Sequence, residues 1–412
     1  MRTAAALFLC FMALWITPVV AETDSSVGIT QKTYDAITSI QELLDAEQWG
    51  EAQQEILALL ERRLNGSERA HALNMLGYTY FNDNDYDRAL ASFLEALEQP
   101  GLPPSQVRAL LTTTSQVCLA AERYPEAEKY ALELLSLEAA HPQPQSQIVL
   151  AQAYMGMEEW QKAVDPLKKA LQMQIDAGAK PRENWMLMLS SVYYALEDYE
   201  SMRDILYEMV ELYPAEKYLI NLAALHGQLG DTDKQLALIE SLLDEERLEK
   251  SYHLMSLVNL FLAKGMPYKA ADLLQREMES GRVETTRQNL EMQSQAWYLA
   301  GEEDRAIPPL EQAAALTGDG ELYLRVARLY MDSYAWQPAE KAARKSLEIG
   351  GLRDEGSAWL VVGMALARGD QLDGARRAFV EAAAHEKSAQ WAEQWLRFVD
   401  TEQKRIAALT VQ

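Results

Sequence analysis

Asp83, Asp85 and Asp87 alternate within the stretch NDNDYD, as carboxylate ligands do at the start of a helix–loop–helix calcium site. Such a loop needs a glycine at its sixth position and a bidentate glutamate at its twelfth. Arg88 and Leu94 stand at those two positions. Because asparagine and aspartate also favour turns, we interpret NDNDYD as a turn between two helices and predict no metal site.

The histidines offer no other metal chemistry, because no two of them are close enough in sequence to form a ligand pair. The five are His71, His141, His226, His253 and His385. The sequence also contains no phosphate-binding loop, nucleophile elbow or zinc motif. We therefore predict no catalytic, cofactor-binding or metal-binding residues, and a protein that is not an enzyme.

A triad of a small residue, an aromatic residue three positions on and a small residue twelve positions on recurs along the chain. Gly77, Tyr80 and Ala89 show it most clearly. The other members, some of them degenerate, are Ile40/Leu43/Ala52, Ser115/Cys118/Ala127, Ala151/Tyr154/Ala163, Ser190/Tyr193/Met202, Ala223/His226/Gln235, Val258/Phe261/Ala270, Ser294/Trp297/Ala306, Ala327/Tyr330/Ala339 and Gly363/Leu366/Ala375. Successive triads begin 33 to 39 residues apart. A period near 34 residues with two helices in each unit is typical of tetratricopeptide repeats.

The repeat predicts an all-α fold: a tetratricopeptide-repeat superhelix, or α-solenoid, of about ten helix pairs with a C-terminal capping helix. In each pair, helix A and helix B are antiparallel. Gly77 and Ala89 are small so that the two helices can approach closely, and Tyr80 fills the space beside them. Phe93 is expected on the face of helix B that meets the next repeat. His226 takes the aromatic place of its triad, so we expect it to be packed in the core.

Four segments follow from the pattern. Residues 1–21 combine a basic start, an apolar run and a small residue before the expected cut, as secretory signal peptides do; an uncleaved membrane anchor is the alternative. Residues 22–32 form a short lead, 33–387 the superhelix, and 388–412 the capping helix and tail. No later segment is apolar enough to span a membrane, so we expect a periplasmic protein. Cys118 would then be the only cysteine, which excludes an internal disulfide, and we expect its thiol to be buried and inert.

The charge of the chain argues against nucleic acid as a partner. The formal net charge is −24, and phosphates would be repelled by it. Residues 22–266 contain 19 basic and 39 acidic residues, whereas residues 267–412 contain 18 and 23. This asymmetry has two interpretations: the two ends meet different surroundings, or acidic helix surfaces keep the chain soluble.

Helix-A residues that point away from helix B line the concave surface of such a superhelix. Amide side chains there could bind the backbone of an extended peptide. Arg325 and Arg328, three residues apart on one helix face, could bind an acidic segment or a terminal carboxylate; a solvated arginine pair is the alternative. The expected partner-binding residues are Asn74, Tyr78, Phe81, Asn184, Tyr194, Asn221, Asn259, Gln295, Tyr298, Arg325 and Arg328.

Four segments carry a resemblance to a narrower family. They are ENWMLMLSSVYYALEDY (183–199), PYKAADLLQREMESGRVE (267–284), QAWYLAGEEDRAIPPLEQAA (295–314) and DGELYLRVARLY (319–330). The chain resembles, over about 105–400, the periplasmic tetratricopeptide protein that accompanies some TonB energy-transduction systems of Gram-negative bacteria.

The resemblance implies that the protein works with TonB and an ExbB/ExbD-type inner-membrane motor, which power the uptake of iron chelates across the outer membrane. The family has no catalytic residues, so none is carried over to this chain. A periplasmic scaffold or chaperone for envelope-protein assembly is the alternative, because it needs the same concave surface.

Overall fold

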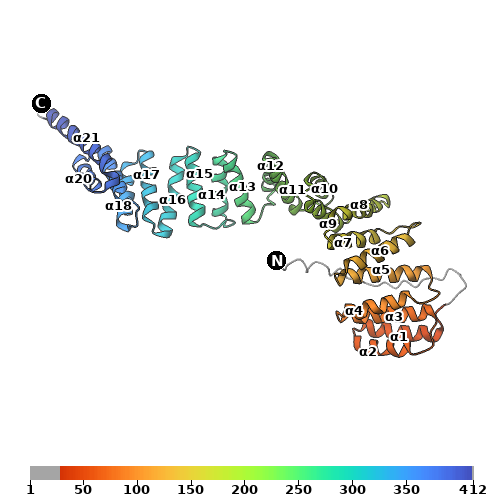
Figure 1. Ribbon diagram of the computed structural model, residues 1–412. Coiled ribbons are helices and arrows are strands. Elements are labelled where there is room, and N and C mark those ends of the chain that lie inside the picture. Colours follow the sequence, from red (N-terminus) through yellow and green to blue (C-terminus); the bar gives the residue numbers. More distant parts are fainter. Residues whose placement is uncertain (1–27, 411–412) are drawn as a thin grey trace. The chain divides into compact units, whose positions relative to one another are not determined.

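The computed structural model describes residues 28–410, and every regular element in that range is an α-helix (Figure 1). The 21 helices form ten consecutive pairs and a final single helix. The all-α prediction, with about ten pairs and a capping helix, is therefore confirmed. The expected signal peptide at residues 1–21 lies outside the described residues. Within 28–410, no helix is both long and apolar enough to cross a membrane.

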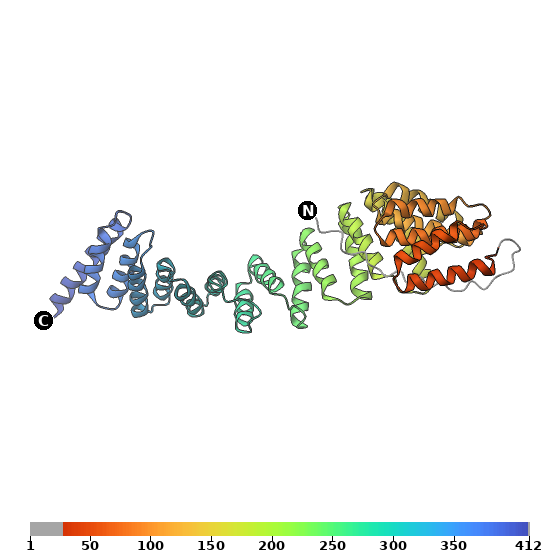
Figure 2. The same cartoon turned by 90° about the horizontal axis from the view of Figure 1, so that it is seen from below.

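The chain divides into two compact units that meet at Ile205 and Leu206, inside one helix. The first unit contains α1 (Gln31–Asp45), α2 (Trp49–Leu60), α3 (Gly66–Asn82), α4 (Tyr86–Leu97), α5 (Pro104–Ala120), α6 (Tyr124–Leu137), α7 (Pro144–Gly156), α8 (Trp160–Asp176), α9 (Glu183–Ala195) and the start of α10 (Tyr199–Leu212). The second unit contains the rest of α10, then α11 (Glu216–Gln228), α12 (Thr232–Asp244), α13 (Ser251–Ala263), α14 (Pro267–Glu279), α15 (Arg287–Leu299), α16 (Glu303–Thr317), α17 (Gly320–Asp332), α18 (Trp336–Ile349), α19 (Glu355–Arg368), α20 (Leu372–Ala383) and α21 (Glu386–Thr410). Within each unit, successive helices pack side by side (Figures 1 and 2).

Each turn between helix A and helix B contains one residue in the left-handed region, with φ between 57° and 80°. These ten residues are Glu47, Asn84, Glu122, Glu158, Glu197, Gly230, Gly265, Gly301, Tyr334 and Asp370. In the stretch NDNDYD, α3 ends at Asn82, Asn84 is the left-handed residue, and the Asp85 carboxylate accepts the N–H of Arg88 (3.0 Å) to cap α4. The prediction of a turn there is confirmed.

The same turn explains where the triad lies in each repeat. The residue after the left-handed one donates its N–H to the C=O of the second triad residue, at 2.8–3.0 Å in all ten pairs. Asp85 donates to Tyr80 in this way, and Asp231 donates to His226. This is the long hydrogen bond of a Schellman motif, which closes the C-terminus of a helix. The triad is therefore registered to the end of helix A in every repeat.

In two pairs the first triad residue is a glycine against which a phenylalanine of helix B packs. A Cβ on Gly77 would lie 2.5 Å from the ring of Phe93, and a Cβ on Gly363 would lie 2.5 Å from the ring of Phe379. Phe93 thus packs within its own pair, while it also belongs to a buried cluster with Cys118 of the next repeat. We predicted the contact of Phe93 with the next repeat but not its contact with helix A of its own pair.

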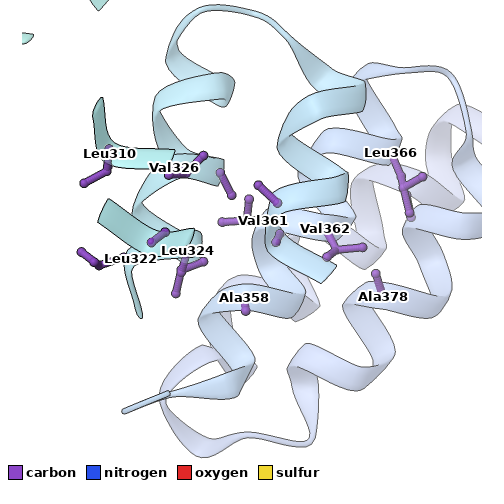
Figure 3. Packing of buried hydrophobic residues seen from close by; sticks show 14 of the residues in the cluster. Leu310, Leu322, Leu324, Val326, Ala358, Val361, Val362, Leu366 and Ala378 are labelled. Carbon is purple, nitrogen blue, oxygen red and sulfur yellow. The ribbon is translucent and has the colours of Figure 1, made fainter. Parts of the chain in front are cut away.

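The core of each unit continues from one pair to the next. In the second unit, Leu310, Leu324, Val362 and Ala378 belong to one buried cluster that runs from α15 to α21 (Figure 3). The final helix closes this cluster. Val399 of α21 is fully buried in it, and other residues of the helix pack beside it.

Candidate protein-binding site

His226 and Cys118, whose side chains could act as a base or a nucleophile, are buried in the core. His226 is buried; the Tyr207 hydroxyl lies 2.9 Å from its Nε2, and its Nδ1 lies 3.7 Å from Asp231. His226 therefore belongs to the core, as predicted. Cys118 is also buried, and burial, together with the nearby Glu126 carboxylate, raises the pKa of its thiol to about 12. Among residues 28–410, no group of three His, Cys, Asp or Glu side chains could hold a metal ion.

Three of the predicted groove residues lie on α3 and are half-buried. The ring of Tyr78 meets Phe93 edge-on at 5.6 Å, and its hydroxyl lies 3.4 Å from the Thr113 hydroxyl on α5. Phe81 packs beside Tyr86, with ring centroids 5.7 Å apart. Asn74 is half-buried as well. On α3, Tyr78 and Phe81 therefore contribute to packing within the first unit.

The remaining predicted residues on helix A are mostly exposed. Tyr194 is 57% exposed and Tyr298 is 46% exposed. The full exposed set is Asn184, Tyr194, Asn221, Asn259, Gln295, Tyr298 and Arg328. Asn184 and Tyr194 belong to the first unit and the others to the second. Polar and aromatic side chains are thus exposed on helix A in each unit, although the ring of Tyr194 also contacts Tyr199.

Three of these exposed residues hold the same place in consecutive repeats. Asn259 on α13, Gln295 on α15 and Arg328 on α17 each follow the first residue of their triad directly. Because the triads are in register with the helix ends, the three side chains form a row across three helix pairs of the second unit. We call this place the row position.

The row position also reveals residues that the sequence prediction missed. In the first unit it holds Gln41, Gln116 and Gln152, all half-buried. An amide therefore occupies the row position in five of the ten repeats, counting Asn259 and Gln295. The sequence signal was present, since each of these residues stands immediately after the first member of a triad, but the prediction selected helix-A residues at several different places.

The two arginines that were expected to act together have different surroundings. Arg325 forms an ion pair with Glu291 of α15, and Arg287 approaches the same carboxylate at 2.7 Å. Partial burial alone would raise the pKa of Glu291, but the hydrogen bonds from Arg287 and Arg325 lower it below its usual value. The charge of Arg325 is thus already balanced. Arg328 is exposed and has no ion-pair partner among residues 28–410.

Two grooves lie between helices B in the second unit, at equivalent places one repeat apart. The larger, about 850 Å³, is bounded by α16 and α18 and has Tyr323 and Tyr330 of α17 along it. Burial, and then the hydrogen bond to Glu311 (2.8 Å), raises the pKa of Tyr330 to about 12. The smaller, about 520 Å³, lies between α14 and α16. Charged side chains of both signs border the larger groove, so it selects no single ligand charge.

The helix pairs, the shared turn and the open helix-A surface define the class of protein as a tetratricopeptide-repeat solenoid. Residues 38–105 match the family model described as tetratricopeptide repeat. The match covers residues 38–105, and the other helix pairs among the described residues close with the same turn, as in a tetratricopeptide-repeat superhelix.

Several solved structures are similar at low identity. A tetratricopeptide repeat protein from Parabacteroides merdae is 16% identical, with 64% of this chain and 99% of that chain covered and a TM-score of 0.37. MamA from Desulfovibrio magneticus is 17% identical, with 45% and 97% covered and a TM-score of 0.38. The structure of Naa15/Naa10 bound to HypK-THB gives 11% identity, 88% and 64% coverage and a TM-score of 0.42. No curated protein sequence matches the chain.

Proposed function

We propose that this protein is a non-catalytic binding protein whose helix-A surface holds an extended segment of a partner protein. The observation that carries the proposal is the row of amides and Arg328 at one place in successive repeats. An amide side chain both donates and accepts hydrogen bonds, so it can bind the N–H and C=O of a peptide backbone whatever the side chains of the peptide. The row residues lie on the successive helices A α13, α15 and α17, so one extended segment that crosses these helices could meet all three side chains.

The exposed tyrosine beside the row adds contacts for side chains. Tyr298 follows Gln295 by three residues and therefore lies on the same face of α15. Tyrosine presents a large, rigid contact area with a polar end, which suits it to recognition surfaces. Arg328 adds an unbalanced positive charge in the next repeat. The segment that fits this order is extended and carries a carboxylate near the α17 end.

The partner and the compartment rest on the resemblance and on the N-terminal pattern. We propose a periplasmic location after removal of residues 1–21. We propose that the bound segment belongs to TonB or to an ExbB/ExbD-type component, so that the protein supports outer-membrane uptake of iron chelates. A scaffold or chaperone for envelope proteins would use the same row on other clients.

A photo-crosslinking residue placed at Gln295 in intact cells tests both the binding surface and the identity of the partner. We expect crosslinks to TonB-type motor components from this position. Gln54 on α2 is a matched control, because it is an exposed glutamine on a helix B. Equal crosslinking at the two positions would refute the role of the row, whereas crosslinks from Gln295 to outer-membrane precursors would support the scaffold instead.

Substitution of the amides gives a quantitative test on the partner that the crosslinks identify. Each lost hydrogen bond costs roughly 0.5–1.5 kcal/mol. Asn259→Ala with Gln295→Ala should therefore weaken binding by about 1–3 kcal/mol, or roughly fivefold to 150-fold. A deletion strain should also grow poorly on a chelated iron source that requires TonB. Normal growth there, with no second copy of the gene, would leave the scaffold as the better reading.

A further inference from the structure

Two aromatic side chains lie exposed on α21. Trp391 is 61% exposed and Phe398 is 47% exposed. They are seven residues apart and therefore lie on one face of the helix, two turns from each other. Ala392 and Val399, each one residue further on, are fully buried on the adjoining face. We call the surface of Trp391 and Phe398 the aromatic face of α21.

The inner face of α21 is already fixed by the second unit. Trp395 stacks on Phe379 of α20, with ring centroids 5.5 Å apart and planes 12° apart. Trp395 also meets Phe398 edge-on at 5.5 Å, so the aromatic face is held in place by a packed residue beneath it. Trp391 and Phe398 are exposed and so do not close the core, and large aromatic side chains on one helix face offer contact area to another protein.

Helix α21 is also longer than α20, the helix on which it packs. It has 25 residues, against 12 in α20. The Gln403 amide donates to Asp373, at the start of α20 (2.7 Å). Because the two helices are antiparallel, the residues of α21 after Gln403 continue past the N-terminal end of α20, as Figure 1 shows for the end of the described chain. A partner therefore has a long helical surface to lie along.

We infer that a second copy of this chain covers the aromatic face, with the two α21 helices antiparallel. In a two-fold interface, residue i meets residue j and j meets i. With the axis between Gln394 and Trp395, Trp391 meets Phe398 of the partner subunit. The same axis places Lys387 opposite Glu402 of the partner subunit.

The charges favour this arrangement over a parallel one. Lys387 is exposed and has no ion-pair partner among residues 28–410, whereas Glu402 has only the exposed Arg405 (2.7 Å). A parallel pair of helices would bring each Lys387 near its own copy, and like charges repel. The antiparallel pair instead gives one favourable contact at each end of the aromatic face.

The oligomeric state of the purified protein tests the inference. One pair of crossing helices buries less area than a standard interface, so we expect a weak dimer with a dissociation constant in the micromolar range. Sedimentation equilibrium over a range of protein concentrations should show monomer converting to dimer. Trp391→Ser with Phe398→Ser should raise the dissociation constant at least tenfold while circular dichroism stays unchanged. Tyr334→Ser is the control, because Tyr334 is 77% exposed but lies elsewhere, between α17 and α18.

A charge exchange keeps the test independent of any loss of folding. Lys387→Glu alone should weaken the dimer by repulsion from Glu402, and Lys387→Glu combined with Glu402→Lys should restore it. A wild-type protein that stays monomeric at about 200 µM, well above the expected micromolar constant, would overturn the inference. A dimer of the double variant that is as weak as the dimer of Lys387→Glu alone would also overturn the inference. The aromatic face is separate from the row position, so this outcome is independent of partner binding.

Discussion

The contact between Gly77 and Phe93 gives the sharpest stability prediction, through the substitution Gly77→Ala. The added Cβ would lie 2.5, 2.6 and 2.8 Å from three atoms of the Phe93 ring. Phe93 is fully buried, and Tyr78 packs edge-on against it. The ring cannot leave its place without disturbing this contact, so α3 and α4 must move apart.

Two effects of opposite sign determine the size of the change. Alanine is favoured over glycine inside a helix by about 1 kcal/mol. Overpacking of a filled core costs about 1–3 kcal/mol. The net expectation for Gly77→Ala is therefore a loss of up to about 2 kcal/mol in the unfolding free energy, in spite of the better helix propensity.

Gly50→Ala supplies the matched control. Gly50 is exposed near the start of α2, and a Cβ there would meet nothing within 4 Å. This variant should gain up to about 1 kcal/mol, because only the propensity term remains. Since repeat proteins need not unfold in one step, hydrogen exchange in α1–α4 should be measured together with urea unfolding.

A double-mutant cycle identifies the contact itself. Phe93→Leu removes the edge of the ring that the new Cβ would strike. Gly77→Ala should then cost at least about 1 kcal/mol less in the Phe93→Leu background than in the wild type, within the range seen for contacting residues. Equal stabilisation by Gly77→Ala and Gly50→Ala, or purely additive effects in the cycle, would refute the reasoning.

Two further changes test the turns and the N-terminal packing. Glu122→Gly should raise the unfolding free energy by about 0.5–1 kcal/mol, because a left-handed conformation costs a residue with a side chain about 1–2 kcal/mol and the greater chain entropy of unfolded glycine offsets only part of this gain. Gly301→Ala, at φ 74°, should lower the unfolding free energy. Urea unfolding of both variants measures the two changes. Burial alone would raise the pKa of Glu68, but hydrogen bonds from Asn65 and Thr30 lower it from 4.5 to about 2. A carboxyl group whose pKa is lowered by folding stabilises the fold at pH values above its unfolded pKa, and this stabilisation is lost as the pH falls through 4.5 towards 2. In Glu68→Gln the unfolding free energy should therefore fall less steeply over that pH range, as acid unfolding can measure.

The repeat could be predicted because packing imposes it on the sequence. Small residues such as Gly77 and Ala163 stand in most repeats where helix A meets helix B, and their spacing survives even where the aromatic place holds Cys118 or Leu366. The left-handed turn residues could not be predicted in the same way. Glu122 and similar residues hold a conformation that favours glycine, because the hydrogen bonds of the turn outweigh the strain.

The candidate site was only partly predictable for a different reason. The sequence places a residue on helix A, but not which neighbour it meets. Arg325 stands two residues before the first member of its triad, and that place lies beside Glu291 of the preceding helix A. Arg328 stands one residue after it and has no ion-pair partner among residues 28–410. A shift of three positions along one helix therefore separates a structural ion pair from a candidate binding residue.

The row position has a further property that favours binding over folding. The fold accepts very different side chains there, since it holds Tyr78 in one repeat, Ala224 in another and Met364 in a third. Packing therefore does not require an amide, and an exposed amide such as Gln295 adds nothing to the core. An interaction with the backbone of another chain would explain why amides stand at this one place in repeats whose cores differ. A binding experiment should therefore substitute the residues at the row position in several repeats together, rather than one residue alone.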